Sequence, residues 1–117
     1  MIVEAAVGVT SDGGKVPEPF VIAPEGELDI ASVGPFRDAL AQAERRAGQD
    51  VVVDLSEVSF IDSSGLGALV DLHNRLRRDN RELAVVAPGG TAAAVLLNLA
   101  GLRNRLPVRE TRPGPES

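Results

Sequence analysis

The spacing of apolar residues changes from strand-like to helix-like near the middle of the chain. Val51, Val52 and Val53 form a continuous β-branched run, which is typical of a strand buried on both faces. Farther along, apolar side chains recur every three or four residues, at Leu66, Leu69, Val70, Leu72 and Leu76. This period matches one face of an α-helix. The pattern therefore predicts a buried strand over residues 50–55 and a helix from residue 63 to about 79.

Capping and turn residues indicate further elements. Short strand-like segments occur at residues 2–10, 20–23, 83–87 and 106–108, and the first of them alternates weakly, as an edge strand does. Ser32 is placed to cap a helix that Gly48 ends, and Pro35 falls in its first turn, where a missing N–H group is tolerated. Thr91 is placed to cap a third helix, and Gly101 is placed to end it.

This order of elements predicts the fold class. Strands that alternate with helices favour right-handed crossovers and helices packed on a sheet. We expect an α/β fold in a single domain, with a mixed sheet of four to five strands and about three to four helices. A chain of 117 residues has the size of one domain. Residues 1–111 should form this domain, and residues 112–117, with two prolines and a glycine, should form a disordered tail.

Composition excludes several classes of site. The chain has no cysteine and one histidine, which excludes disulfides, thiol chemistry and the usual zinc sites, and we expect neither a metal ion nor a cofactor. A net charge of −5 argues against direct binding to nucleic acid, whose phosphates require a basic surface. No apolar run approaches the ~20 residues that cross a bilayer. The first residues do not resemble a secretory signal, so we expect a cytoplasmic protein without membrane contact.

A serine hydrolase is not predicted either. The nucleophile elbow of such enzymes places a glycine on each side of the serine, whereas Gly65 and Gly67 both follow Ser64. The one histidine, His73, lies nine residues beyond Ser64 on the same predicted helix. At ~1.5 Å per residue this is about 13 Å, too far for a hydrogen bond. We interpret His73 as a surface or half-buried helix residue and expect that the chain is not an enzyme.

Two serines follow an acid where the buried strand gives way to the helix, at Asp62, Ser63 and Ser64. The first amide N–H groups of a helix lack internal partners, and that end carries partial positive charge. Both a capping side chain and a phosphate are favoured there, and Gly65 and Gly67 leave the hydroxyls uncrowded. Such a site suits a serine that is reversibly phosphorylated. The alternative is that these residues are only N-caps, which stabilise a helix by about 0.5–2 kcal/mol.

A second acid, Asp29, also follows a strand-like segment, so it and Asp62 can lie at the same edge of the sheet. One interpretation is an acidic rim around Ser64, which would help to position the hydroxyl beside the magnesium–nucleotide of a kinase. The other interpretation is that each acid only caps a helix or a turn.

Four arginines cluster near the end of the second predicted helix, at Arg75, Arg77, Arg78 and Arg81. Basic side chains at that end complement the negative C-terminal dipole, so we interpret the cluster as a solvent-exposed face. A docking patch for an acidic partner is the alternative.

Two motifs in register resemble the signature of a known family. The sequence DSSGLG at residues 62–67, preceded by VDLSEV at residues 53–58, closely resembles that of bacterial anti-sigma factor antagonists of the STAS family. The sequence GELD at residues 26–29 resembles that family's segment at the entry to its first helix. Two later segments also match, VVAP at residues 85–88 and LAGL at residues 99–102. The resemblance implies a STAS-like domain with its phospho-acceptor loop exposed at one end.

The resemblance also implies a switch controlled by phosphorylation. In its unphosphorylated form the protein would bind an anti-sigma factor of the serine-kinase type and so release a sigma factor. The kinase would phosphorylate Ser64, the second serine of the pair, and a serine phosphatase would restore binding. Partner contacts are expected at Asp29, Asp62, Ser63, Ser64, Gly65 and Leu66.

A scaffold is the alternative of a different class. Related STAS domains serve as constitutive scaffolds, or as accessory subunits of transporters and of lipid-trafficking or stress-signalling complexes. Such a module would use the same surface without phosphorylation. For either role we expect a monomer or a weak dimer.

Overall fold

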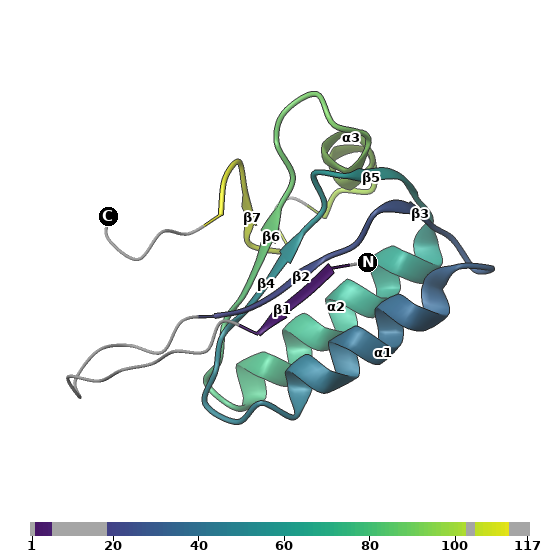
Figure 1. Cartoon of the computed structure of the whole chain (residues 1–117). Coiled ribbons are helices and arrows are strands. Elements are labelled where there is room, and N and C mark those ends of the chain that lie inside the picture. The colour runs from purple at the N-terminus through teal and green to yellow at the C-terminus, as the bar shows by residue number, and fades with distance from the viewer. Residues whose placement is uncertain (1, 6–18, 103–104, 113–117) are drawn as a thin grey trace.

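A computed structural model describes residues 2–5, 19–102 and 105–112 of the chain. These residues form seven strands and three helices: β1 (Ile2–Ala5), β2 (Phe20–Ala23), β3 (Gly26–Leu28), α1 (Val33–Glu44), β4 (Val51–Asp54), β5 (Val58–Ile61), α2 (Ser63–Arg78), β6 (Leu83–Val86), α3 (Ala92–Leu99) and β7 (Val108–Arg109). The helices α1 and α2 run side by side along one face of the main sheet, and α3 lies against β5 (Figure 1). The predicted α/β fold is confirmed.

The main sheet has five strands in the order β1-β2-β4-β6-β7. β1 pairs antiparallel with β2 at one edge, and the other neighbours pair in parallel. Parallel neighbours need a crossover connection, which α1 provides between β2 and β4, and α2 between β4 and β6. The mixed sheet and its edge strand therefore agree with the prediction. The rest of the predicted first strand, residues 6–10, lies outside the described residues.

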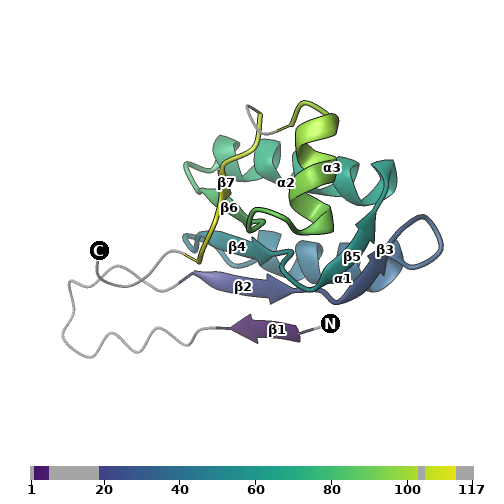
Figure 2. The ribbon, with the colours of Figure 1, turned by 90° about the horizontal axis from the view of Figure 1, so that it is seen from above.

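Two short strands, β3 and β5, form a second, parallel sheet that the sequence pattern does not predict. Pro24 has no N–H group to extend the ladder of β2, and Gly26 adopts a φ of +80°, a conformation that favours glycine. The chain leaves the main sheet at this bend and pairs with β5, with a shift in register. Figure 2 shows β3 and β5 beyond the ends of β2 and β4.

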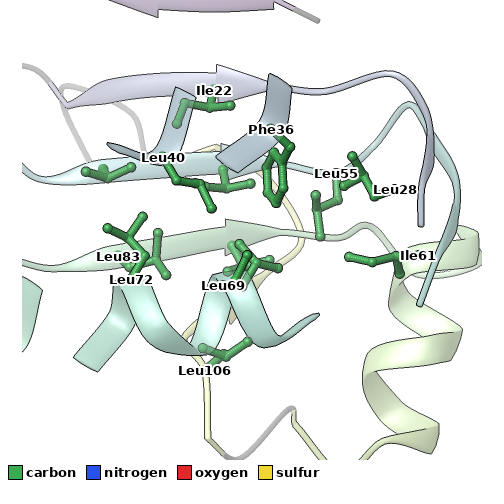
Figure 3. Packing of buried hydrophobic residues seen from close by; sticks show 14 of the residues in the cluster. Ile22, Leu28, Phe36, Leu40, Leu55, Ile61, Leu69, Leu72, Leu83 and Leu106 are labelled. Carbon is green, nitrogen blue, oxygen red and sulfur yellow. The ribbon is translucent and has the colours of Figure 1, made fainter. Parts of the chain in front are cut away.

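The hydrophobic core lies between the main sheet and the two helices α1 and α2 (Figure 3). Alternate positions of β2, β4 and β6 point into it and are buried: Phe20, Ile22, Val51, Val53, Leu83 and Val85. The intervening positions Val21, Val52 and Val86 form a second, smaller buried cluster. The valine run of β4 is thus buried on both faces, as predicted.

The helix caps agree with the prediction for α3 and differ for α1. Thr91 caps α3, with its Oγ1 3.2 Å from a backbone N–H group of the first turn, and Gly101 follows the helix with a φ of +71°. Ser32 occupies the N-cap position of α1, but its side chain makes no capping bond. Its hydroxyl lies instead 2.9 Å from Oδ1 of Asp29 and 2.8 Å from the carbonyl oxygen of Glu27. The prediction that Ser32 caps α1 is therefore wrong.

The predicted basic face at the end of α2 holds for three of its four arginines. Arg75, Arg77 and Arg78 are exposed and lie in the last turn of the helix. Arg81 is only 4% exposed, and its guanidinium donates three hydrogen bonds of 2.7–2.8 Å to backbone carbonyls at and beyond the end of α1. The carbonyls of Ala43 and Glu44 lie at the negative C-terminal end of α1, which makes a buried cation favourable there. The prediction that Arg81 is solvent-exposed is wrong.

Arg112, the first residue of the predicted tail, contacts the main sheet. Its Nε donates to Oδ2 of Asp54 at 2.7 Å. Burial of the Asp54 carboxyl raises its pKa, but hydrogen bonds from Ser56 and Arg112 outweigh this effect, and the pKa lies below its usual value. Residues 113–117 lie outside the described residues.

Candidate functional site

The pairing of β3 with β5 brings the two predicted acidic segments together. Leu28 lies opposite Ile61 at the ends of these parallel strands, and the N–H group of Asp62 donates to the carbonyl oxygen of Leu28 at 3.1 Å. Asp29 and Asp62 are each the next residue after these strand ends. The two acids therefore leave the sheet at the same edge, in the arrangement that we interpreted as an acidic rim.

Asp62 connects two backbone segments through its two carboxylate oxygens. Oδ1 accepts from the N–H group of Ser64 at 2.8 Å, which caps α2. Oδ2 accepts from the N–H group of Ile30 at 3.2 Å, in the loop between β3 and α1. The capping interpretation is thus correct for Asp62, and the same side chain also ties the neighbouring loop to the start of α2.

Asp29 organises the turn that follows β3. Its Oδ1 accepts from the backbone N–H groups of Ala31 and Ser32, both at 3.0 Å, and lies 2.9 Å from the Ser32 hydroxyl. The hydrogen bond from that hydroxyl is the main cause that lowers the pKa of the Asp29 carboxyl. Asp29 therefore remains ionised and holds the loop that carries Ile30.

Ser63 and Ser64 are the first two residues of α2. Ser63 is exposed and Ser64 is half-buried. Among the residues that the structure describes, neither hydroxyl has a hydrogen-bond partner, because the cap of α2 is supplied by Asp62 and not by a serine. Both hydroxyls are therefore free to react, at a helix end that favours negative charge.

Gly65 packs closely against the two strands of the second sheet. It is buried, and a Cβ atom there would lie 2.7 Å from Cγ1 of Ile61 and 3.2 Å from the carbonyl oxygen of Leu28. A side chain at this position would push the first turn of α2 away from β3 and β5. We therefore assign Gly65 a packing role, and a partner contact at this position stays a prediction. The next residue, Leu66, is half-buried and packs against the hydrophobic core.

Two residues at the site were not predicted from the sequence. Ile30 is 80% exposed in the loop that Asp29 and Asp62 hold. Arg37, exposed on the second turn of α1, directs Nη2 to the carbonyl oxygen of Ser64 at 3.4 Å. An exposed apolar residue in a loop carries no periodic signal. A surface arginine on a helix is also too common to be noticed without the structure.

No catalytic arrangement is evident in the described part of the chain. His73 is half-buried on α2, as predicted, and its Nδ1 has no hydrogen-bond partner among these residues. Burial, with a smaller contribution from the charge of Arg77, lowers the pKa of this imidazole. In residues 2–5, 19–102 and 105–112, no group of three or more acidic or imidazole side chains is placed to hold a metal ion. Within the same ranges, every helix is too short or too polar to cross a membrane.

Comparisons with known proteins agree with this geometry. A family model described as the STAS domain matches residues 14–113. The chain is 29% identical over 85 residues to the anti-sigma-B factor antagonist of Staphylococcus aureus (strain NCTC 8325 / PS 47), a match that covers 73% of this chain and 78% of that protein.

Solved structures share the fold as well. The crystal structure of an anti-sigma factor antagonist from Mycobacterium paratuberculosis superposes with a TM-score of 0.76 and 26% identity, over 94% of this chain and 84% of that one. The anti-sigma factor antagonist SpoIIAA in its unphosphorylated form superposes with a TM-score of 0.62, over 81% of this chain and 82% of that one. At 20% identity, the second likeness shows the fold alone.

Proposed function

The chain belongs to the STAS domain family, and on this premise we propose that it is an anti-sigma factor antagonist controlled by phosphorylation of Ser64. In its unphosphorylated form it binds an anti-sigma factor of the serine-kinase type and so releases a sigma factor. The kinase phosphorylates Ser64 and ends the binding, and a separate serine phosphatase restores it. In this role the chain is a cytoplasmic regulatory binding protein, monomeric or weakly dimeric, and not an enzyme.

The position of Ser64 is the observation that carries this proposal. Its hydroxyl has no partner among the described residues, and its N–H group is capped by Asp62. A kinase needs a hydroxyl that is free and held in a defined place, because the positioning of the reacting groups supplies much of the rate of phosphoryl transfer. The relatives described above are named for the same role.

The surface around Ser64 is suited to a protein partner. Asp29, Asp62 and Ser63 supply polar groups, and Ile30 adds an apolar side chain that is 80% exposed. Exposed apolar side chains within a polar rim are typical of protein interfaces. Ile30 therefore joins the residues that we expected from the sequence to contact the partner.

Phosphate at Ser64 is expected to separate the partners by charge. A phosphoserine carries roughly −1.5 to −2 charges, which the free helix end tolerates. In a complex, the same charge is buried beside Asp62, where repulsion and lost solvation cost several kcal/mol. At about 1.4 kcal/mol per tenfold, a penalty of ~3–4 kcal/mol weakens binding roughly 100- to 1,000-fold without refolding.

Calorimetric titration with the anti-sigma factor kinase encoded in the same genome tests the proposal. Ser64→Glu should keep its far-UV spectrum and melting temperature but bind about 100-fold more weakly than the wild type. Thr111→Glu adds the same charge at an exposed position near the end of the described chain and serves as the matched control. It should bind like the wild type. Equal affinities for all three proteins would refute the switch and favour a constitutive scaffold.

A further inference from the structure

The contact between Arg37 and Ser64 has no evident role in the unphosphorylated protein. At 3.4 Å, the hydrogen bond from Nη2 to the Ser64 carbonyl oxygen is at the long end of the range, and the side chain is exposed. That carbonyl lies in the first turn of α2, where carbonyl groups already have helical partners farther along the chain. The guanidinium therefore lies beside Ser64 without being needed by the fold.

The rim lacks a positive charge of its own. Its two acids, Asp29 and Asp62, are committed to backbone N–H groups of the turn after β3 and of α2. Asp62 is bound to the amide of Ser64 itself. A phosphoryl group on this serine would thus meet a carboxylate on one side. It would also meet the guanidinium of Arg37, whose Nη2 already lies 3.4 Å from the carbonyl oxygen of the same serine.

We propose that Arg37 is the phosphate-binding residue of phosphorylated Ser64 and holds the phosphoryl group from its position on α1. This inference rests on the proposed function, because it requires that Ser64 carries the phosphate. The planar guanidinium donates two parallel hydrogen bonds to phosphate oxygens, a geometry that lysine does not reproduce. The carbonyl and hydroxyl oxygens belong to the same residue, so a change of side-chain rotamer brings Arg37 to the phosphate without movement of either helix.

The contact also distinguishes the two serines. Arg37 lies against the backbone of Ser64, whereas Ser63 is exposed and precedes it at the start of α2. A phosphoryl group on Ser64 would gain the counter-charge of Arg37. This supports Ser64 as the serine that is held in the phosphorylated state.

The test uses protein in which phosphoserine is incorporated at position 64 during translation, so no kinase is required. The pKa of the phosphate is measured by ³¹P NMR titration in the otherwise wild-type chain and in Arg37→Gln, Arg37→Lys and Arg78→Gln. A guanidinium near the phosphate favours the dianion, so Arg37→Gln should raise the pKa of the phosphate by about half a pH unit. Arg37→Lys, which keeps the charge but not the paired donors, should give an intermediate value.

Arg78→Gln is the matched control, because it removes the same charge from an exposed arginine at the far end of α2, about 21 Å along the helix. It should leave the phosphate pKa unchanged. Far-UV spectra and melting temperatures verify that all variants are folded. Equal phosphate pKa values in the wild type and Arg37→Gln would overturn the assignment of Arg37. Failure of a kinase to modify Ser64 would instead overturn the proposed function and leave this titration unaffected.

Discussion

The two ends of α2 lie in opposite surroundings. Just beyond the C-terminal end, Arg81 is buried and donates to the carbonyl oxygens of Ala43, Glu44 and Gln49, at and after the end of α1, at 2.7–2.8 Å. At the N-terminal end, the cap comes from the half-exposed Asp62, and the serine hydroxyls remain without partners in the described part of the chain. At the C-terminal end, the hydrogen bonds of Arg81 connect the end of α1 with the segments that precede β4 and β6. The N-terminal end leaves reactive groups at the surface. We therefore expect substitutions near the C-terminal end of α2 to act mainly on stability, and those at its N-terminal end to act mainly on the proposed function.

Loss of Arg81 should have the largest effect on stability. Arg81→Met keeps the apolar stem but leaves three backbone carbonyls without their charged donor. We expect a loss of about 3 kcal/mol in the free energy of unfolding, measured by urea denaturation. Arg78→Met, on the exposed side of the same cluster, should change it by no more than about 0.5 kcal/mol. Similar values for the two variants would show that Arg81 does not lock this end.

Two glycines in the first turns of α2 should respond in opposite directions. Gly65→Ala places a methyl group 2.7 Å from Ile61 and should destabilise the protein by about 1–3 kcal/mol. Gly67 has open space at its Cβ position and non-positive φ, so Gly67→Ala should stabilise it by about 0.5–1 kcal/mol through helix propensity. Thermal unfolding followed by circular dichroism measures both. A stabilised Gly65→Ala variant would contradict the close packing of α2 on β3.

Among these destabilising substitutions, Asp62→Asn should change the free energy of unfolding least. Substitutions at Asp62 should have a larger effect on the rate of phosphorylation. Asparagine is as good an N-cap as aspartate, but its single acceptor oxygen cannot also accept from the exposed Ile30 N–H group. Asp62→Asn should therefore lose about 0.5 kcal/mol, whereas Asp62→Ala, which loses both bonds, should lose about 1–2 kcal/mol. If the negative charge positions the serine for the kinase, both variants should be phosphorylated more slowly. A rate that falls only in Asp62→Ala would mean that Asp62 acts through the cap alone.

The sequence predicts best the elements that carry a distinct pattern of apolar residues. The continuous valine run of β4 and the periodic apolar face of α2 are such patterns, and both elements lie where they are predicted. β3 and β5 have three and four residues, and they arise from a bend at Pro24 and Gly26 after which the chain pairs anew. No local pattern encodes such pairing, because it depends on segments that are distant in sequence.

The residues of the candidate site also fall into two groups, those predicted from the sequence and those whose roles only the structure reveals. Asp29, Asp62, Ser63 and Ser64 were predicted from motifs, and the structure brings them to one edge of the fold. The roles of Gly65, Arg37 and Arg81 depend on what lies opposite each residue after folding: a β-strand, a serine backbone and the end of another helix. Arg81 has the same side chain as its exposed neighbours, so only its tertiary surroundings reveal its burial.

The identity of the phosphorylated serine is the central claim, and intact-mass measurement tests it most directly. Wild type, Ser64→Ala and Ser63→Ala are incubated with ATP and the anti-sigma factor kinase from the same genome, and each is weighed by mass spectrometry. We predict a gain of about 80 Da, the mass of one phosphoryl group, in the wild type and in Ser63→Ala, and none in Ser64→Ala. A gain that persists in Ser64→Ala and disappears in Ser63→Ala would contradict the assignment, and no gain in any of the three would contradict the switch.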